Sequence, residues 1–125
     1  MDDLLKIGEH FVDAMRNRHG LDHIDAAYAE NAHSVEAVTP PTRDVRITKG
    51  RDAIKAKRED WLALYELHKL DADGPYLHPP NRFAVRFEAD VTQKTTGKRM
   101  TLCEIAVYSV EDGKIDREEF FIEPR

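Results

Sequence analysis

The spacing of apolar residues changes close to Glu66, and this change restricts the fold more than any other feature. Before it, apolar residues recur every three or four positions, as on the buried face of a helix. After it, they alternate with polar residues, as in strands with one buried face. Helices followed by consecutive strands predict an α+β fold, in which helices cover one face of an antiparallel sheet.

Three helices are expected before the change. The first spans residues 4–15, with basic residues at its end and Gly20 as a left-handed cap. The second begins with Asp22 as its N-cap and ends near Asn31. The third follows Gly50, and its charged run is interpreted as a solvated helix surface. Its apolar face comprises Ile54, Trp61, Leu62 and Tyr65.

The strands are separated by turn signals. A short strand at residues 32–38 precedes Pro40-Pro41, where the chain must form a loop. The connection over residues 39–49 is long for a compact domain, and such loops are often functional. Four more strands are expected at residues 67–72, 82–92, 100–110 and 114–122. Short turns join the last three, which predicts an antiparallel meander.

Length and charge narrow the class of protein. A chain of 125 residues is expected to form one domain over residues 1–125. Its formal charge of −5 argues against a nucleic-acid partner, which requires a basic surface. A single cysteine, Cys103, and an acidic amino terminus favour a cytoplasmic location. No apolar stretch is long enough for a membrane span, so no membrane partner is expected.

The sequence contains no pattern typical of a bound metal or an activated nucleophile. Its histidines lack the spacing of metal ligands, and Cys103 has no patterned histidine partner. There is also no glycine-rich phosphate loop and no dinucleotide-binding fingerprint. Any chemistry is therefore expected to be acid–base work without a cofactor.

The order of elements and five short strings resemble the nuclear transport factor 2-like superfamily, in its SnoaL-like and ketosteroid-isomerase-like branch. These strings are Tyr28-Ala29-Glu30-Asn31-Ala32, Gly50-Arg51-Asp52-Ala53-Ile54, Phe83-Ala84-Val85-Arg86-Phe87, Thr96-Gly97-Lys98 and Asp112-Gly113-Lys114-Ile115. The resemblance covers almost the whole chain. It implies a curved antiparallel sheet wrapped around three helices, which form a cone with a pocket, the cystatin-like fold. Members include isomerases, cyclases, hydrolases and non-catalytic modules, so the resemblance implies no single reaction.

The resemblance places Glu36 at the position of the general base of ketosteroid-isomerase-like members. A carboxylate in an apolar pocket has a raised pKa and can transfer protons near neutral pH. A second interpretation stays open, with Glu36 on the solvent face and Val35 and Ala37 buried. The family's oxyanion donors correspond to Phe11 and Ala106, which cannot donate a hydrogen bond. Efficient ketosteroid isomerisation is therefore not expected.

Two further acids, Glu104 and Glu118, lie on late strands whose facing depends on the turn between them. A three-residue loop with Gly113 in a bulge places both on the concave side, and the family's usual hairpin favours it. A two-residue turn that pairs Glu111 with Lys114 separates them. The alternative to a cluster of free acids is ion pairing across the sheet with Arg86, Arg99 or Arg117.

We therefore expect a small-molecule enzyme with Glu36, Glu104 and Glu118 as acid–base groups on a small hydrophobic substrate. Its reaction would be of the isomerase, cyclase or hydrolase type. The side chains expected to contact the substrate are Phe11, Trp61, Tyr76, Tyr108 and Phe120. The alternative is a non-catalytic ligand-binding or homodimerisation module with the acids in structural pairs. Apolar residues on both faces of the late strands predict a homodimer.

Overall fold

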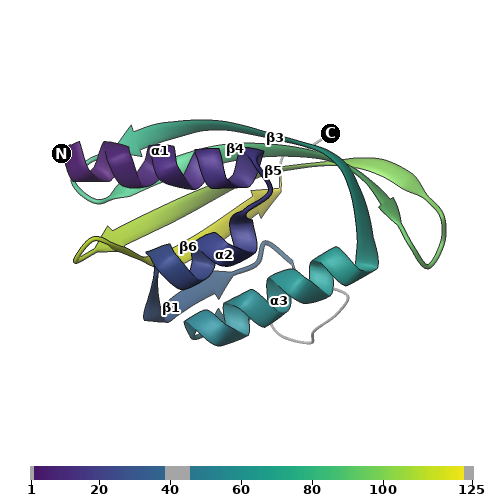
Figure 1. Cartoon of the computed structure of the whole chain (residues 1–125), viewed down its shortest axis with the longest axis horizontal. Helices are drawn as coiled ribbons and strands as arrows, with labels where there is room; N and C mark the ends of the chain where they lie inside the picture. Colours follow the sequence, from purple (N-terminus) through teal and green to yellow (C-terminus); the bar gives the residue numbers. More distant parts are fainter. Residues whose placement is uncertain (1, 39–45, 123–125) are drawn as a thin grey trace.

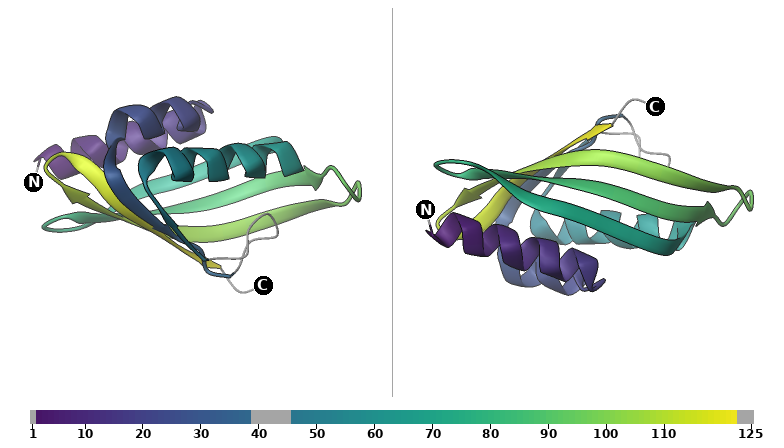
Figure 2. Two further views of the ribbon diagram at one scale, coloured as in Figure 1. Left: turned by 90° about the horizontal axis from the view of Figure 1, so that it is seen from below. Right: turned by 90° about the horizontal axis from the view of Figure 1, so that it is seen from above.

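A curved sheet of six strands is covered on one face by three helices (Figures 1 and 2). The structure is a computed structural model that describes residues 2–38 and 46–122. The helices are α1 (Asp2–Arg16), α2 (Gly20–Ala27) and α3 (Arg51–Leu64). The strands are β1 (Tyr28–Val35), β2 (Ile47–Lys49), β3 (Tyr65–His78), β4 (Arg82–Gln93), β5 (Arg99–Glu111) and β6 (Lys114–Ile122). The predicted α+β fold with a curved sheet around three helices is confirmed.

The strand order is β2-β1-β6-β5-β4-β3. The strands β4, β5 and β6 form the predicted antiparallel meander, and β3 extends it. In contrast, β1 pairs in parallel with β6, so the first and last strands are neighbours. The short strand β2 lies in the segment that was expected to be a connection, and it pairs with β1. The predicted Pro40-Pro41 loop lies outside the described residues.

The link between α1 and α2 differs from the prediction. Arg18, rather than Gly20, adopts the left-handed conformation, with φ of 60°. The backbone N–H of His19 donates to the carbonyl of Ala14 at 2.8 Å, and the backbone N–H of Arg18 donates to the carbonyl of Met15 at 3.2 Å. These two hydrogen bonds form a Schellman motif. The α2 helix then begins at Gly20, two residues before the predicted N-cap.

The Arg18 side chain explains why this position tolerates a strained backbone. Its guanidinium donates to the carbonyls of Leu67 at 3.2 Å and His68 at 2.9 Å. These bonds connect the end of α1 to β3, and they offset part of the cost of the left-handed conformation of a non-glycine residue.

The β5–β6 hairpin begins in the second of the two registers that the sequence allowed, and a bulge then shifts it. Asp112 and Gly113 have φ of 51° and 77°, and Glu111 pairs with Lys114, so the turn has two residues. The predicted three-residue loop is therefore wrong. A bulge follows at once, because Asp116 in β6 has no partner in the β5 register.

This bulge restores the alignment of the pocket-facing side chains. Beyond it Tyr108 pairs with Glu118 and Ala106 with Phe120. Directly opposed residues project from the same face of a sheet, and alternation places Glu104 on that face too. The concave side therefore carries Glu104, Tyr108, Glu118 and Phe120, the predicted set, although the turn differs from the predicted one.

The hydrophobic core lies between this concave face and the helices. Its fully buried side chains come from both layers: Phe11, Ile24, Ile54, Phe83, Val85, Ala106, Tyr108 and Ile115. On the helix side of the core, α1 packs on β3 and β4. No helix within the described ranges is long and apolar enough to cross a membrane.

Candidate functional site

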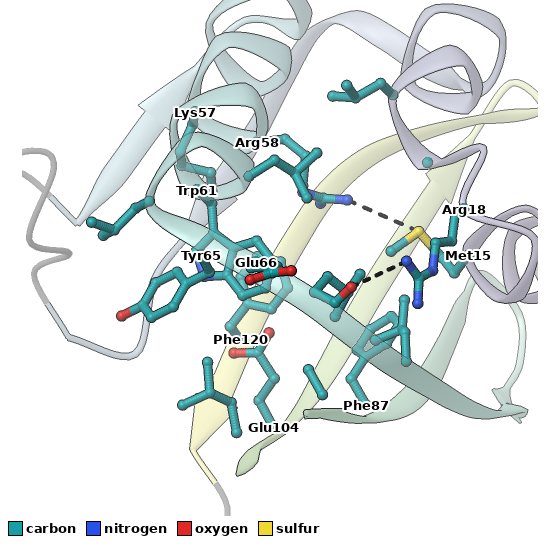
Figure 3. Close-up of a pocket in the computed structure, with 18 of the residues that line it drawn as sticks. Met15, Arg18, Lys57, Arg58, Trp61, Tyr65, Glu66, Phe87, Glu104 and Phe120 are labelled. Carbon is teal, nitrogen blue, oxygen red and sulfur yellow. Dashed lines mark hydrogen bonds between the residues drawn. The ribbon is translucent and has the colours of Figure 1, made fainter. Parts of the chain in front are cut away.

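A cavity of about 1090 Å³ lies between the helices and the concave face of the sheet (Figure 3). Its wall is formed by the end of α1, the start of α2, one face of α3 and strands β3 to β6. The exposed residues Arg18, Glu66 and Lys94 belong to this wall, so the cavity reaches the surface. Its volume lies slightly above the usual range for small-molecule sites, roughly 300–1,000 Å³.

Five of the eight predicted site residues line this cavity, and three do not. Those in the wall are Glu36, Trp61, Glu104, Tyr108 and Phe120. They come from elements that are distant in sequence: the end of β1, α3, β5 and β6.

The expectation that Phe11 and Tyr76 contact a ligand is not supported by their positions. Phe11 is fully buried in the core, where its ring packs on Tyr108 and Phe83 at 4.3 and 5.9 Å between centroids. Tyr76 is 56% exposed and donates a hydrogen bond to Asp73 at 2.5 Å. Neither belongs to the cavity wall.

The charged run of α3 is not a fully solvated surface, which corrects the sequence interpretation. Lys57 is only 7% exposed, and the side chain of Arg58 is 17% exposed. Both line the cavity. Their positions could have been found from helical spacing, because they lie three and four residues after Ile54 and precede Trp61 by four and three.

Glu118 lies fully buried behind the cavity wall and is held by hydrogen bonds from β1. The Tyr28 hydroxyl donates to its Oε1, and the Ser34 hydroxyl donates to its Oε2 at 2.6 Å. The Lys57 Nζ and Arg58 Nη2 atoms lie 3.7 and 3.8 Å from the carboxylate. Burial, and then the Glu118 charge, raises the pKa of Tyr28, so this phenol stays protonated and remains a donor.

The parallel pairing of β1 with β6 creates this arrangement, since it places Ser34 directly beside Glu118. No local pattern in the sequence indicates a parallel partner, so sequence reasoning missed Tyr28 and Ser34. The predicted partners Arg86, Arg99 and Arg117 contact other acids instead. These acids are Glu88 at 3.3 Å, Asp90 at 2.8 Å and Glu119 at 3.0 Å.

Glu36 follows β1 and faces the cavity, the first of the two orientations that the sequence allowed. Its carboxylate accepts a hydrogen bond from Lys57 Nζ, which also donates to Ser34 Oγ at 2.5 Å. Lys57 thus connects Glu36 to the network around Glu118. A half-buried carboxylate in such an ion pair has its charge compensated.

Glu104 has a different environment, although it faces the same cavity from β5. Within residues 2–38 and 46–122, it accepts no hydrogen bond and forms no ion pair. Burial raises the pKa of Glu104 to about 7, and the neighbouring carboxylates of Glu36 and Glu118 contribute in the same direction. A carboxyl group that titrates near neutral pH can both donate and accept a proton.

The part of the chain that the structure describes contains no group of three or more His, Cys, Asp or Glu side chains arranged to hold a metal ion. The polar side chains of the cavity wall include two acids of the predicted site, the two cations of α3 and the phenol of Tyr108. Apolar and aromatic side chains form much of the inner wall. They include Leu70, Phe87, Ala89, Leu102 and Phe120.

Comparison with known proteins gives a consistent result. The profile of the SnoaL-like domain matches residues 5–122. No curated protein is significantly similar in sequence. Among solved structures, a proposed SnoaL-like polyketide cyclase from Mesorhizobium loti is 31% identical, with a TM-score of 0.85, over 93% of this chain and 96% of that one.

Two other solved structures share the fold at lower identity. A proposed isomerase from Bacillus subtilis is 19% identical with a TM-score of 0.76, over 98% of this chain and 88% of that one. An NTF2-like protein of unknown function from Burkholderia pseudomallei is 17% identical with a TM-score of 0.74, over 98% and 92% of the two chains.

Proposed function

This chain belongs to the SnoaL-like domain family, and we propose that it is an acid–base enzyme acting on a small, largely apolar molecule. Its cavity holds an unpaired carboxyl group. The single observation that carries the proposal is Glu104. It is partly buried, lies in the wall of a large cavity and has no partner among the described residues.

The chemistry follows from the raised pKa of Glu104. At neutral pH both its protonated and its charged form are populated, so it can remove a proton from a bound substrate and return it elsewhere. A reaction of this kind moves or removes a hydrogen next to a carbonyl group, as in an isomerisation or an aldol-type cyclisation. It needs no cofactor, since the carboxyl group transfers the proton.

The other two predicted acids support this role in different ways. Glu36 reaches the cavity but is paired with Lys57, and Glu118 is buried behind the wall. Both raise the pKa of Glu104 through their charge. We therefore propose Glu104 as the catalytic acid–base group, and Glu36 and Glu118 as positioning residues that tune it.

A non-catalytic ligand-binding module is the second candidate function. The observation that favours it is the pairing of Glu36 with Lys57 and of Glu118 with Tyr28 and Ser34, as expected if the acids are structural. The two candidates differ in one measurable property. Only the enzyme accelerates proton exchange in a molecule that it binds.

The first test measures this exchange directly. A panel of small ketones such as 2-tetralone is incubated with the protein in D₂O, and loss of the α-proton signal is followed by NMR. We expect acceleration by the wild type that rises with pH through about 7, as Glu104 becomes the charged base. Glu104→Gln should lower the accelerated rate by about 10²-fold or more.

Glu111→Gln is the matched control, because Glu111 is an exposed acid on the same strand. Its exchange rate should equal that of the wild type. If ketones bind, as shown by saturable shifts, but exchange no faster than in buffer, the enzyme proposal is wrong and the binding module is retained.

A further inference from the structure

The guanidinium of Arg58 points into the cavity without an oxygen partner at hydrogen-bond distance (Figure 3). Within the described ranges its contacts are the thioether of Met15 at 3.9 Å and the carboxylate of Glu118 at 3.8 Å. A guanidinium carries five N–H donors, and buried polar groups nearly always find hydrogen-bond partners. This side chain, only 17% exposed, is therefore short of acceptors.

Glu118 does not use Arg58 as a hydrogen-bond donor. Its two oxygens already accept hydrogen bonds from Tyr28 and Ser34, and Lys57 lies 3.7 Å away. The carboxylate keeps Arg58 charged, because its attraction raises the pKa of the guanidinium despite the opposing effect of burial. The N–H groups of Arg58 remain available to a molecule in the cavity.

A second donor without a partner lies in the same part of the wall. The hydroxyl of Tyr108 is buried and has no hydrogen-bond partner among the described residues. Its ring is fixed by Phe83, stacked at 5.0 Å between centroids, and by Phe11 at 4.3 Å. The phenol also interacts electrostatically with Arg58 and Glu104, so the three groups share one region.

We propose that the inner end of the cavity is a subsite for the carboxylate group of an otherwise apolar ligand, bound by the guanidinium of Arg58 and the hydroxyl of Tyr108. A planar guanidinium can bind a carboxylate through two parallel hydrogen bonds. The apolar wall would receive the rest of the ligand. This inference deepens the proposed function, on which it rests for the identification of the cavity as a substrate site.

The charges around the subsite make its affinity for a carboxylate depend on pH. The anions of Glu36 and Glu118 balance the cations of Lys57 and Arg58, and Glu104 adds a negative charge when it ionises. An incoming carboxylate is therefore accepted best while Glu104 is protonated. Affinity should fall as pH rises above about 7, by up to tenfold per pH unit, with uptake of one proton on binding.

The test compares two probes of the same shape by titration calorimetry on the full chain, 2-naphthoate and 2-naphthamide. At pH 6 the carboxylate should bind at least about tenfold more tightly than the amide. Arg58→Met should weaken naphthoate binding by about 10- to 100-fold and leave naphthamide nearly unchanged. Arg82→Met, an exposed arginine outside this cavity, is the control and should change neither affinity.

Tyr108→Phe provides a second variant. Unlike Arg58→Met, it removes no charge, so its result does not depend on whether the protein folds without that charge. It should weaken naphthoate binding by about 5- to 10-fold. Its melting temperature should stay the same or rise, since the change removes a buried hydroxyl that has no partner. A purely structural tyrosine would show the opposite pattern, with lower stability and unchanged affinity.

Three results would overturn the proposal: no binding of naphthoate at millimolar concentration, equal binding of acid and amide, or full naphthoate affinity in both variants. The outcome is separable from that of the proposed function, because Glu104→Gln should still bind naphthoate at pH 6. Naphthoate binding, together with ketones that bind but exchange no faster than in buffer, would retain the subsite and refute the enzyme.

Discussion

Three glutamates lie around one cavity, and their environments differ because each has different hydrogen-bond and ion-pair partners. Glu118 receives two hydroxyl donors from β1, and Glu36 receives the ammonium of Lys57. Glu104 on β5 receives neither a hydroxyl donor nor the ammonium of Lys57, which is paired with Glu36 and lies beside Glu118. Glu118 is thus a buried hydrogen-bond acceptor, Glu36 is an ion-paired residue of the cavity wall, and Glu104 is a group that titrates near neutral pH.

The isolation of Glu104 should appear in the pH dependence of stability. Its pKa is about 7 in the folded protein, against about 4.5 in the unfolded chain. Between these values the folded state binds more protons than the unfolded state, so the free energy of unfolding falls as pH rises. The full loss, reached above pH 7, is of the order of 3 kcal/mol.

We expect Glu104→Gln to remove this loss. The variant should match the wild type near pH 4.5 and exceed it in free energy of unfolding at pH 8. Urea denaturation at pH 4.5, 6, 7 and 8 measures the difference, with Glu111→Gln as the exposed control. A difference between variant and wild type that stays constant over this range would contradict the assignment of a raised pKa to Glu104.

At the scale of elements, close approach between a helix and a strand depends on particular small residues. Gly8 of α1 faces Pro75 of β3, and a Cβ atom at Gly8 would lie 2.8 and 2.9 Å from the Cβ and Cγ atoms of that proline. These distances are shorter than carbon atoms tolerate. The helix can therefore lie against β3 at this depth only with glycine at this position.

Gly8→Ala is expected to destabilise the protein, although alanine is the better helix former by about 1 kcal/mol. Overpacking at a buried contact typically costs about 1–3 kcal/mol, so the net change should lower the melting temperature. Thermal denaturation measures this change. Glu9→Ala, at the exposed neighbouring position of α1, is the control and should leave the melting temperature nearly unchanged.

On the scale of the whole molecule, the helices cover only the concave face of the sheet (Figure 2). The opposite face exposes the cross-strand pair Ile105 and Phe121, at 38% and 47%, with Val107 beside them. Apolar residues that face water on a sheet favour burial against a second surface. We propose that a second copy of this chain covers them, as the two-sided apolar pattern of the late strands suggested.

Dimerisation should therefore depend on this outer pair. We expect a dimer at micromolar concentration by light scattering coupled to gel filtration, and a monomer for Phe121→Glu, because a charge would be buried without a partner. Leu5→Glu, an exposed apolar residue on α1, is the control and should remain dimeric. A monomeric wild type at this concentration would contradict the proposal.

Local patterns were sufficient to predict most of the elements. The change of apolar spacing separated the three helices from strands β3 to β6, and the predicted bounds of the last strand, 114–122, agree with the structure. The alternation also placed Glu104 and Tyr108 on one face. These features follow from neighbours within a few residues in sequence, which is the range over which hydrophobic periodicity acts.

The partners of each site residue were decided by the tertiary structure alone. The sequence pattern assigns Lys57 to a solvated helix surface, whereas in the structure β1 and β6 pack against Lys57 and bury it. The parallel pairing that brings Ser34 to Glu118 joins residues 84 positions apart, and no local signal encodes it. Periodicity determines which face a side chain occupies, whereas hydrogen bonding, burial and charge depend on what the rest of the chain places opposite that face.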